Sequence, residues 1–237
     1  TTNVISLAYS YTDVVWNTLT IASSANYTVD TKAPTVVITD DKATTTNGNI
    51  TYTFTFSEAV SGFDATDITV ANGTKGTFSG SGTTYTLVVT PTANFEGNVT
   101  VDVAANVATD AATNNNTAAT QNVQAVDTKA PTATITMADA ALKAGETSLV
   151  TITFSEIVTG FTNADLTIAN GTLSAVASVD GGKTYTGTFT PTANIESTTN
   201  VISLAASYTD VVGNTGTIAS SANYTVDTKA PTEKITN

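Results

Sequence analysis

Acidic side chains are the residues of this sequence that could do chemistry, because most other catalytic and metal-binding types are missing. The 237 residues include no histidine, cysteine or arginine, and 20 acidic residues stand against 8 lysines, for a net charge of −12. This composition removes the commonest general base, thiol nucleophiles, disulfides and cysteine-ligated zinc sites. Carboxylates can still bind hard cations such as Ca²⁺, or act in pairs as in glycosidases. The charge argues against nucleic acid and against anionic membrane surfaces as partners.

A recurring heptapeptide divides the chain into units. Val-Asp-Thr-Lys-Ala-Pro-Thr begins at Val29, Val126 and Val226, with spacings of 97 and 100 residues. Between these marks Phe-Ser-Glu, Asn-Gly-Thr, Thr-Pro-Thr-Ala-Asn and Thr-Asp recur in the same order. Self-similarity at a fixed period indicates a tandem array. We therefore predict two whole repeats, at residues 30–126 and 127–226, and the start of another at residues 227–237.

The first residues of the chain repeat the end of the second unit. Residues 1–35 match residues 198–232 except that Tyr9, Trp16 and Leu19 replace Ala206, Gly213 and Gly216. We predict that residues 1–29 are the C-terminal F–G hairpin of a preceding repeat. A lone hairpin is marginally stable in water, and the three larger side chains add apolar surface. This hairpin is therefore a candidate for self-association with another chain.

Polar and apolar residues alternate along each unit, which predicts an all-β fold. Residues 51–56, 151–154 and 184–190 place aromatic or aliphatic side chains on one face and threonine on the other, as a half-buried strand requires. The second unit shows seven such segments, near residues 133–137, 148–155, 165–169, 173–179, 184–190, 200–205 and 221–226. Seven strands in about 100 residues is the count of an immunoglobulin-like sandwich. The predicted fold is a tandem of seven-stranded immunoglobulin-like β-sandwiches.

Strand direction then predicts where the acidic residues meet. In such a sandwich the start of strand A, the B–C turn and the F–G loop share one end of the domain. The residues placed there are Asp30, Glu58, Asp67 and Asp110 in the first repeat, and Asp127, Glu156, Asp165 and Asp210 in the second. Converging carboxylates repel one another unless a cation lies among them, and Ca²⁺ takes six to eight oxygen ligands. We predict Ca²⁺ at this end of each of the two repeats, where it would stiffen the linkers that contain Asp30 and Asp127.

The linker Asp-Thr-Lys-Ala-Pro-Thr, the Phe-Ser-Glu block and the loop Tyr-Thr-Asp-Val-Val-Gly-Asn at residues 208–214 together resemble bacterial Ig-like repeats of giant biofilm-associated and RTX-type surface adhesins. The resemblance covers essentially the whole chain. It implies an extracellular extender at the bacterial cell surface, often stiffened by Ca²⁺, between an anchored end and a ligand-binding end. The chain departs from the loop pattern at Thr113 and Trp16, which stand where the second repeat has Gly213. If the loop needs a glycine at positive φ, the resemblance does not carry the loop geometry over to those two copies.

We predict that this chain is a non-catalytic extender whose partners are neighbouring repeats, without nucleic-acid binding or membrane insertion. One alternative is a module that binds a glycan or a host protein. Such a module should carry a copy-specific insertion or an exposed aromatic cluster, and neither whole repeat has one. Another alternative is a spacer in a secreted polysaccharide-degrading enzyme, which the neighbouring domains of the parent protein would reveal.

Overall fold

Strands are the main regular elements of the computed structural model, which describes residues 3–6, 12, 14–16 and 23–233. The chain divides into two units: one comprises residues 1–41, 50–90 and 99–124, and the other residues 42–49, 91–98 and 125–237. No α-helix occurs in the described residues, where two 3-10 helices, η1 (Ala65–Asp67) and η2 (Asn163–Asp165), are the helical elements. Accordingly, no helix in this part of the chain could span a membrane. The predicted all-β class is confirmed.

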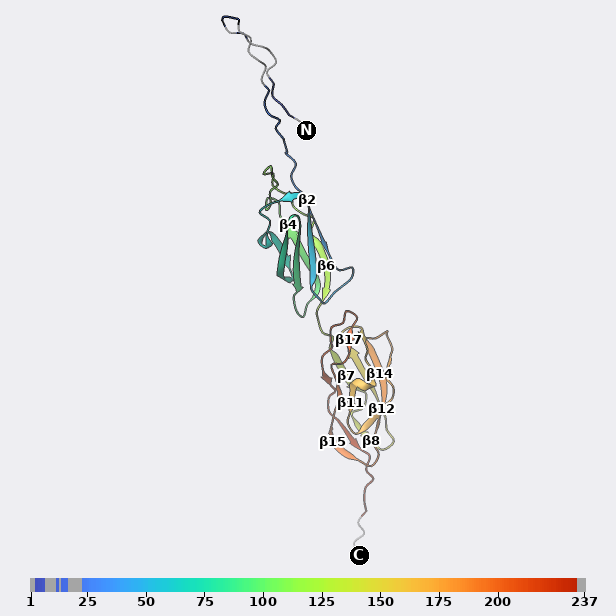
Figure 1. The fold of residues 1–237 in the computed structure, drawn as a ribbon. Coiled ribbons are helices and arrows are strands. Elements are labelled where there is room, and N and C mark those ends of the chain that lie inside the picture. The colour runs from blue at the N-terminus through green and yellow to red at the C-terminus, as the bar shows by residue number, and fades with distance from the viewer. Residues whose placement is uncertain (1–2, 7–11, 13, 17–22, 234–237) are drawn as a thin grey trace. The chain divides into compact units, whose positions relative to one another are not determined.

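The first repeat consists of two sheets (Figure 1). One has the order β1 (Val36–Asp40), β2 (Ile50–Val60) and β4 (Gly73–Pro91). The other has the order β3 (Ile68–Ala71), β5 (Glu96–Val103) and β6 (Asn122–Asp127). Every second residue at the start of β2 is buried, and these residues are Ile50, Tyr52, Phe54 and Phe56. The alternation predicted for residues 51–56 therefore sets which face of β2 packs into the core.

The second repeat uses the same scheme with more, shorter strands. One sheet has the order β12 (Gly171–Leu173), β14 (Thr184–Pro191), β9 (Ser148–Phe154) and β7 (Ala133–Met137), and β13 (Ala177–Ser178) also pairs with β14. Facing strands are β11 (Leu166–Ile168), β16 (Ile202–Leu204) and β18 (Ala219–Ser220) in one sheet, and β15 (Glu196–Asn200), β19 (Tyr224–Asp227) and β8 (Ala141–Lys143) in another. All seven predicted segments contain strand residues. The segment 173–179 is split between β12 and β13.

Four short strands of the second repeat lie outside the predicted segments, and one of them is β18, just before the segment 221–226. Two of them, β10 (Val158–Thr159) and β17 (Thr209–Asp210), pair antiparallel and join the B–C turn to the F–G loop. The fourth, β8, pairs in parallel with the last strand, β19, over three residue pairs. The first repeat has a single parallel bridge of this kind, between Thr46 and Val126. These pairings are too short to leave a periodic signal in the sequence.

Candidate metal centres

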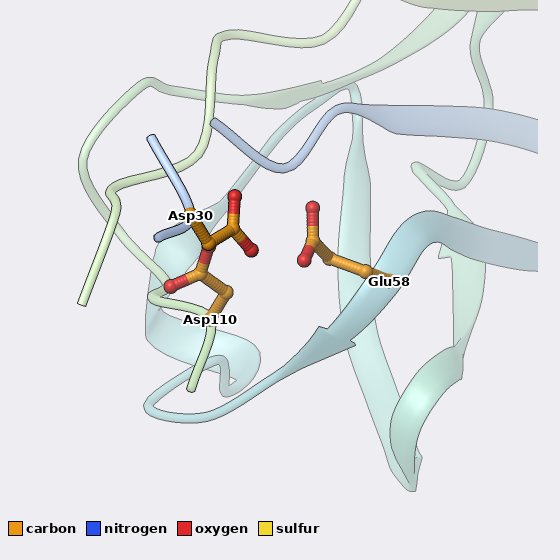
Figure 2. Close-up of side chains that lie close together, drawn as sticks. All are labelled: Asp30, Glu58 and Asp110. Atoms are coloured by element: carbon orange, nitrogen blue, oxygen red, sulfur yellow. The ribbon is translucent and has the colours of Figure 1, made fainter. Parts of the chain in front are cut away.

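Three carboxylates converge in each repeat, and they come from the elements that the strand directions predict. In the first repeat they belong to Asp30, which precedes β1, Glu58 in β2 and Asp110 in the F–G loop, and one oxygen from each lies within 4.8 Å of the others. Figure 2 shows these three side chains lying close together, with Asp30 and Glu58 facing one another. In the second repeat Asp127, Glu156 and Asp210 meet the same criterion. We call these groups the first and second acidic triads.

The F–G loop of the second repeat fixes Asp210 firmly. This residue lies in β17 and is 1% exposed. Its Oδ1 accepts hydrogen bonds from the backbone nitrogens of the next residues in the loop, Val212, Gly213 and Asn214, at 2.8, 2.6 and 2.9 Å. Its Oδ2 accepts a hydrogen bond from Asn214 Nδ2 at 2.6 Å. The carboxylate is therefore held in place by its own loop before any ligand is considered.

The same asparagine ties the linker to the loop. Asn214 Nδ2 also donates to the carbonyl oxygen of Asp127 at 2.9 Å. In the first repeat Asn114 Nδ2 donates to Asp110 Oδ2 at 2.8 Å and to the carbonyl oxygen of Asp30 at 3.2 Å. Hydrogen bonds to the charged form favour it, and those from Asn114, its side chain first, lower the pKa of Asp110. The two triads thus share one hydrogen-bonded frame.

The glutamates lack such support. Among the described residues nothing donates a hydrogen bond to the carboxylate of Glu58 or Glu156, and both side chains are half-buried. Burial raises the pKa of Glu156, and the charges of Asp127 and Asp210 raise it further. Each triad therefore combines two carboxylates held by backbone or amide donors with a third whose lone pairs are unused. This donor set suits a hard cation, which would also remove the repulsion among the three charges.

A family model for the bacterial Ig-like domain matches residues 30–126 and 127–226. The chain belongs to this family. The Ig-like part of the resemblance is therefore confirmed, and so is the predicted tandem of Ig-like sandwiches. No curated protein sequence matches the chain.

Solved structures are also similar to this tandem of Ig-like domains. The I9–I11 tandem from titin is 10% identical with a TM-score of 0.39, covering 83% of this chain and 64% of that one. InvD of Yersinia pseudotuberculosis is 15% identical with a TM-score of 0.34, covering 88% and 62%. FdeC, an Escherichia coli adhesin, is 16% identical with a TM-score of 0.30, covering 85% and 65%. The chain spans less than two thirds of the length of each of these structures.

Asp67 and Asp165, which were predicted to join the triads, are used differently in both Ig-like domains. Each is the last residue of a 3-10 helix and forms a capping box. Asp67 Oδ2 accepts a hydrogen bond from the backbone nitrogen of Asp64 at 2.8 Å, and Asp165 Oδ2 accepts one from Thr162 at 2.7 Å. Ser207 Oγ donates to the other oxygen of Asp165. The two aspartates begin strand C at the expected place, but the capping box directs their carboxylates back to the chain instead of into the triads.

The loop position at which a glycine was considered necessary has a positive φ in all three copies. Gly213 has φ +98°, Thr113 has φ +66° and Trp16 has φ +68°. The left-handed region is unfavourable for a β-branched residue, so Thr113 carries local strain that Gly213 avoids. The loop therefore does not need a glycine at this position, where the backbone nitrogen of Thr113 donates a hydrogen bond to the carbonyl oxygen of Asp110 at 3.2 Å. Trp16 is 84% exposed, whereas Tyr9 and Leu19 lie outside the described residues, so self-association of the hairpin stays a prediction.

Asn114 and Asn214 hold the triad aspartates by hydrogen bonds, and the sequence reasoning missed them. A local signal was present, because Asp-x-x-x-Asn recurs at residues 13–17, 110–114 and 210–214. An aspartate that accepts hydrogen bonds from the residues after it is a common loop motif. The asparagine was overlooked because its second partner, the carbonyl oxygen of the linker aspartate, is 84 or 87 residues away in the chain.

Proposed function

We propose that this chain is a non-catalytic, load-bearing segment of the stalk of a large bacterial surface adhesin, and that it works outside the cell. In this proposal each Ig-like domain binds one Ca²⁺ through its acidic triad, and its partners are the neighbouring repeats. The observation that carries the proposal is the recurrence of one triad, with one asparagine frame, in both domains. Catalysis is no part of the proposed role.

The triads supply ligands of the right chemistry for Ca²⁺. In the second domain Asp127, Glu156 and Asp210 would hold the cation, with further oxygens from backbone carbonyls and water. Glu156 is the residue with the most to gain, because its carboxylate is half-buried near two other charges without a hydrogen-bond donor. In the first domain Asp30, Glu58 and Asp110 would act in the same way. Bound Ca²⁺ would turn a repulsive group into a cross-link between linker, strand B and F–G loop.

Such a cross-link suits a stalk because the linker is one of its arms. Asp127 is both the last residue of β6 and a member of the second triad. Fixing its carboxylate would restrict the backbone that connects one domain to the next. The next residues add stiffness, because Pro131 has a fixed φ and Ala130 before it is biased to extended backbone. Length with limited bending is the property an extender needs, and adding repeats increases its reach.

The strand order also suits mechanical load. A domain pulled from its two termini transmits force through its first and last strands. In the second domain β8, close to the N-terminal side of the domain, pairs in parallel with the final strand β19. Pulling these two strands from opposite ends shears all their hydrogen bonds together instead of opening them one by one. This pairing supports a load-bearing role.

The experiment that tests the Ca²⁺ proposal is calorimetric unfolding of the whole chain with and without the cation. Extracellular modules bind Ca²⁺ with a Kd of roughly 10⁻⁴–10⁻³ M. At 10 mM Ca²⁺ this corresponds to a stabilisation of about 1.4–2.7 kcal/mol per site. We expect EDTA to lower Tm and to shorten the chain in solution scattering without unfolding either core.

A pair of variants isolates the triad from general charge effects. Glu156→Gln should remove most of the Ca²⁺-dependent rise in Tm of the second domain. Asp180→Asn is the matched control, because Asp180 also lies in that domain but its carboxylate accepts hydrogen bonds within its own turn, from Lys183 and Thr184. Unchanged melting and unchanged scattering length in EDTA would refute Ca²⁺ binding by the triads, and stiffness would then have to come from linker packing.

A further inference from the structure

The first Ig-like domain contains a polar cluster that the second lacks. Asp40 at the end of β1 lies opposite Tyr52 of β2 in the strand register. Asn122 at the start of β6 reaches across from the other sheet, and its Nδ2 donates to Asp40 Oδ2 at 3.0 Å and to the carbonyl oxygen of Ile38 at 3.4 Å. The matching positions of the second domain are Met137, Val150 and Ala222. All three side chains thus change from polar to apolar together.

Two buried oxygen atoms in this cluster have no hydrogen-bond partner. They are the hydroxyl oxygen of Tyr52, whose side chain is 0% exposed, and Asn122 Oδ1. A buried polar atom without a partner costs about 1–3 kcal/mol, and in native proteins such an atom indicates an ion or water that completes it. Both atoms are directed into one region, because Tyr52 pairs with Asp40 across the strands and the Asn122 amide is bound to the same aspartate.

The two domains carry fully buried tyrosines on different strands. In the second domain the fully buried tyrosine of this region is Tyr224 on β19, and its hydroxyl donates to the carbonyl oxygen of Ala169. The position on β6 that matches Tyr224 is Gln124, whereas Tyr52 lies on β2. The second domain thus satisfies its phenol within the protein, whereas the first leaves a phenol oxygen beside acidic residues.

The charge around the two oxygens is negative. Burial raises the pKa of the Tyr52 phenol, and the charges of Asp40 and Asp41 raise it further, so the phenol stays protonated and offers a neutral oxygen. One oxygen of Asp41, Oδ1, accepts a hydrogen bond from the backbone nitrogen of Thr51 at 2.8 Å, which fixes that carboxylate next to β2. A neutral water would satisfy the two orphan atoms, whereas a cation would in addition interact favourably with the carboxylates that act on the Tyr52 phenol.

We propose that this cluster is a further binding site for a hard divalent cation such as Ca²⁺. The ligands are carboxylate oxygens of Asp40 and Asp41, Asn122 Oδ1 and the hydroxyl oxygen of Tyr52, with water completing the six to eight oxygens that Ca²⁺ prefers. The site is separate from the first acidic triad, because Asp30 precedes β1 whereas Asp40 ends it. It belongs to the first domain alone.

The number of bound Ca²⁺ ions per chain separates this proposal from that for the triads. Equilibrium dialysis of the full chain should give three ions, and the double variant Glu58→Gln with Glu156→Gln should retain one. Two ions in the wild type and none in the double variant would overturn the additional site and leave the triads. One ion in both proteins would support this site and refute the triads.

Tb³⁺, used as a luminescent substitute for Ca²⁺, locates the retained ion. Tyrosine sensitises Tb³⁺ only at short range, so the double variant should show tyrosine-sensitised emission that Ca²⁺ displaces. Adding Asn122→Ala should weaken Tb³⁺ binding at least about tenfold. The triple exchange Asp40→Met, Tyr52→Val and Asn122→Ala installs the apolar set of the second domain and should abolish the emission while the sandwich still melts cooperatively. Emission that is absent, or unchanged by these substitutions, would show that the cluster holds water only.

Discussion

The F–G loop is packed by a buried tyrosine in the second domain, where it carries Asp210, and by a buried asparagine in the first domain. Tyr208 is 0% exposed, and its hydroxyl donates to the carbonyl oxygens of Thr217 at 2.8 Å and Pro131 at 3.3 Å. Gly216 lies against the ring, so a Cβ added there would be 2.2 Å from two ring carbons. Such a separation is far below van der Waals contact, and a side chain at this position must displace the ring.

The first domain has Ala108 and Asn116 at the two matching positions. Asn116 is 2% exposed and fills the space with four hydrogen bonds of 2.9 Å. Its Oδ1 accepts from the backbone nitrogens of Val107 and Ala108, and its Nδ2 donates to the carbonyl oxygens of Ala104 and Thr117. The Tyr–Gly and Ala–Asn pairs are therefore alternative ways of packing one loop, and this leads to a prediction about their exchange.

We expect Tyr208→Ala alone to cost about 3–5 kcal/mol, the usual range for truncating a large buried aromatic side chain. Gly216→Asn alone should cost about 1–3 kcal/mol or more, because the core is overpacked. The double variant should lose less than the two single losses combined, with a coupling of about 2–3 kcal/mol, because the asparagine can then make the bonds of Asn116. The assay is chemical unfolding of the four full-length proteins, following the second domain.

The reverse exchange, Ala108→Tyr with Asn116→Gly, is the matched control in the first domain and should show coupling of the same sign. Free energies that add within about 0.5 kcal/mol in both domains would refute the reasoning, since independent sites behave in that way. Among the wild type, Tyr208→Ala, Gly216→Asn and the double variant, the stabilisation by Ca²⁺ should rank in the same order as the free energy of unfolding, because Asp210 is two residues beyond Tyr208 in the loop.

Three further outcomes are expected. Without Ca²⁺, the Glu156→Gln variant should be more stable than the wild type at pH 7. The folded protein raises the pKa of Glu156, so the stability of the wild type falls as pH rises from about 4.3, the pKa in the unfolded chain, through the pKa in the folded chain. Unfolding at several pH values checks this, and 10 mM Ca²⁺ should make the wild type the more stable of the two proteins. Thr113→Gly should stabilise the first domain by about 0.5–1 kcal/mol and Gly213→Thr should destabilise the second by about 1–2 kcal/mol, as thermal unfolding would show. In single-molecule stretching the second domain should unfold at higher force, because β8 and β19 pair over three residues where the first domain has one bridge.

Much of the fold follows from local pattern, and much of the site follows from topology. Alternation of threonine with apolar residues determines which face of β2 is buried, because each side chain on a strand points opposite to the next. Strand direction then places the linker, the B–C turn and the F–G loop at one end. That argument is independent of side-chain detail, and it brought Asp127, Glu156 and Asp210 together correctly.

The same argument could not predict where each carboxylate points. Asp165 begins strand C as expected, yet its direction is set by a capping box with Thr162. The pattern Thr-x-x-Asp was visible in the sequence, and so was Asp-x-x-Asp at residues 64–67, and read as local capping signals they exclude both aspartates from the triads. Exchanges such as Tyr208 with Ala108 are a different matter. They depend on which distant side chain fills a volume, and a single sequence does not encode that directly.

A comparison of the two domains distinguishes residues that serve packing, which differ between them, from the residues of the acidic triad and its frame, which are the same in both. They differ in how the F–G loop is packed and in whether Tyr52 or Tyr224 fills the core, so each domain is free to reach a stable sandwich in its own way. Both retain the triad, the asparagine and the left-handed loop residue, even though glycine in place of Thr113 would stabilise the domain by about 0.5–1 kcal/mol. A loop serving packing alone could change its conformation to relieve the strain at Thr113. The hydrogen bonds from this loop position Asp110 instead, as the proposed binding of Ca²⁺ by the triad requires.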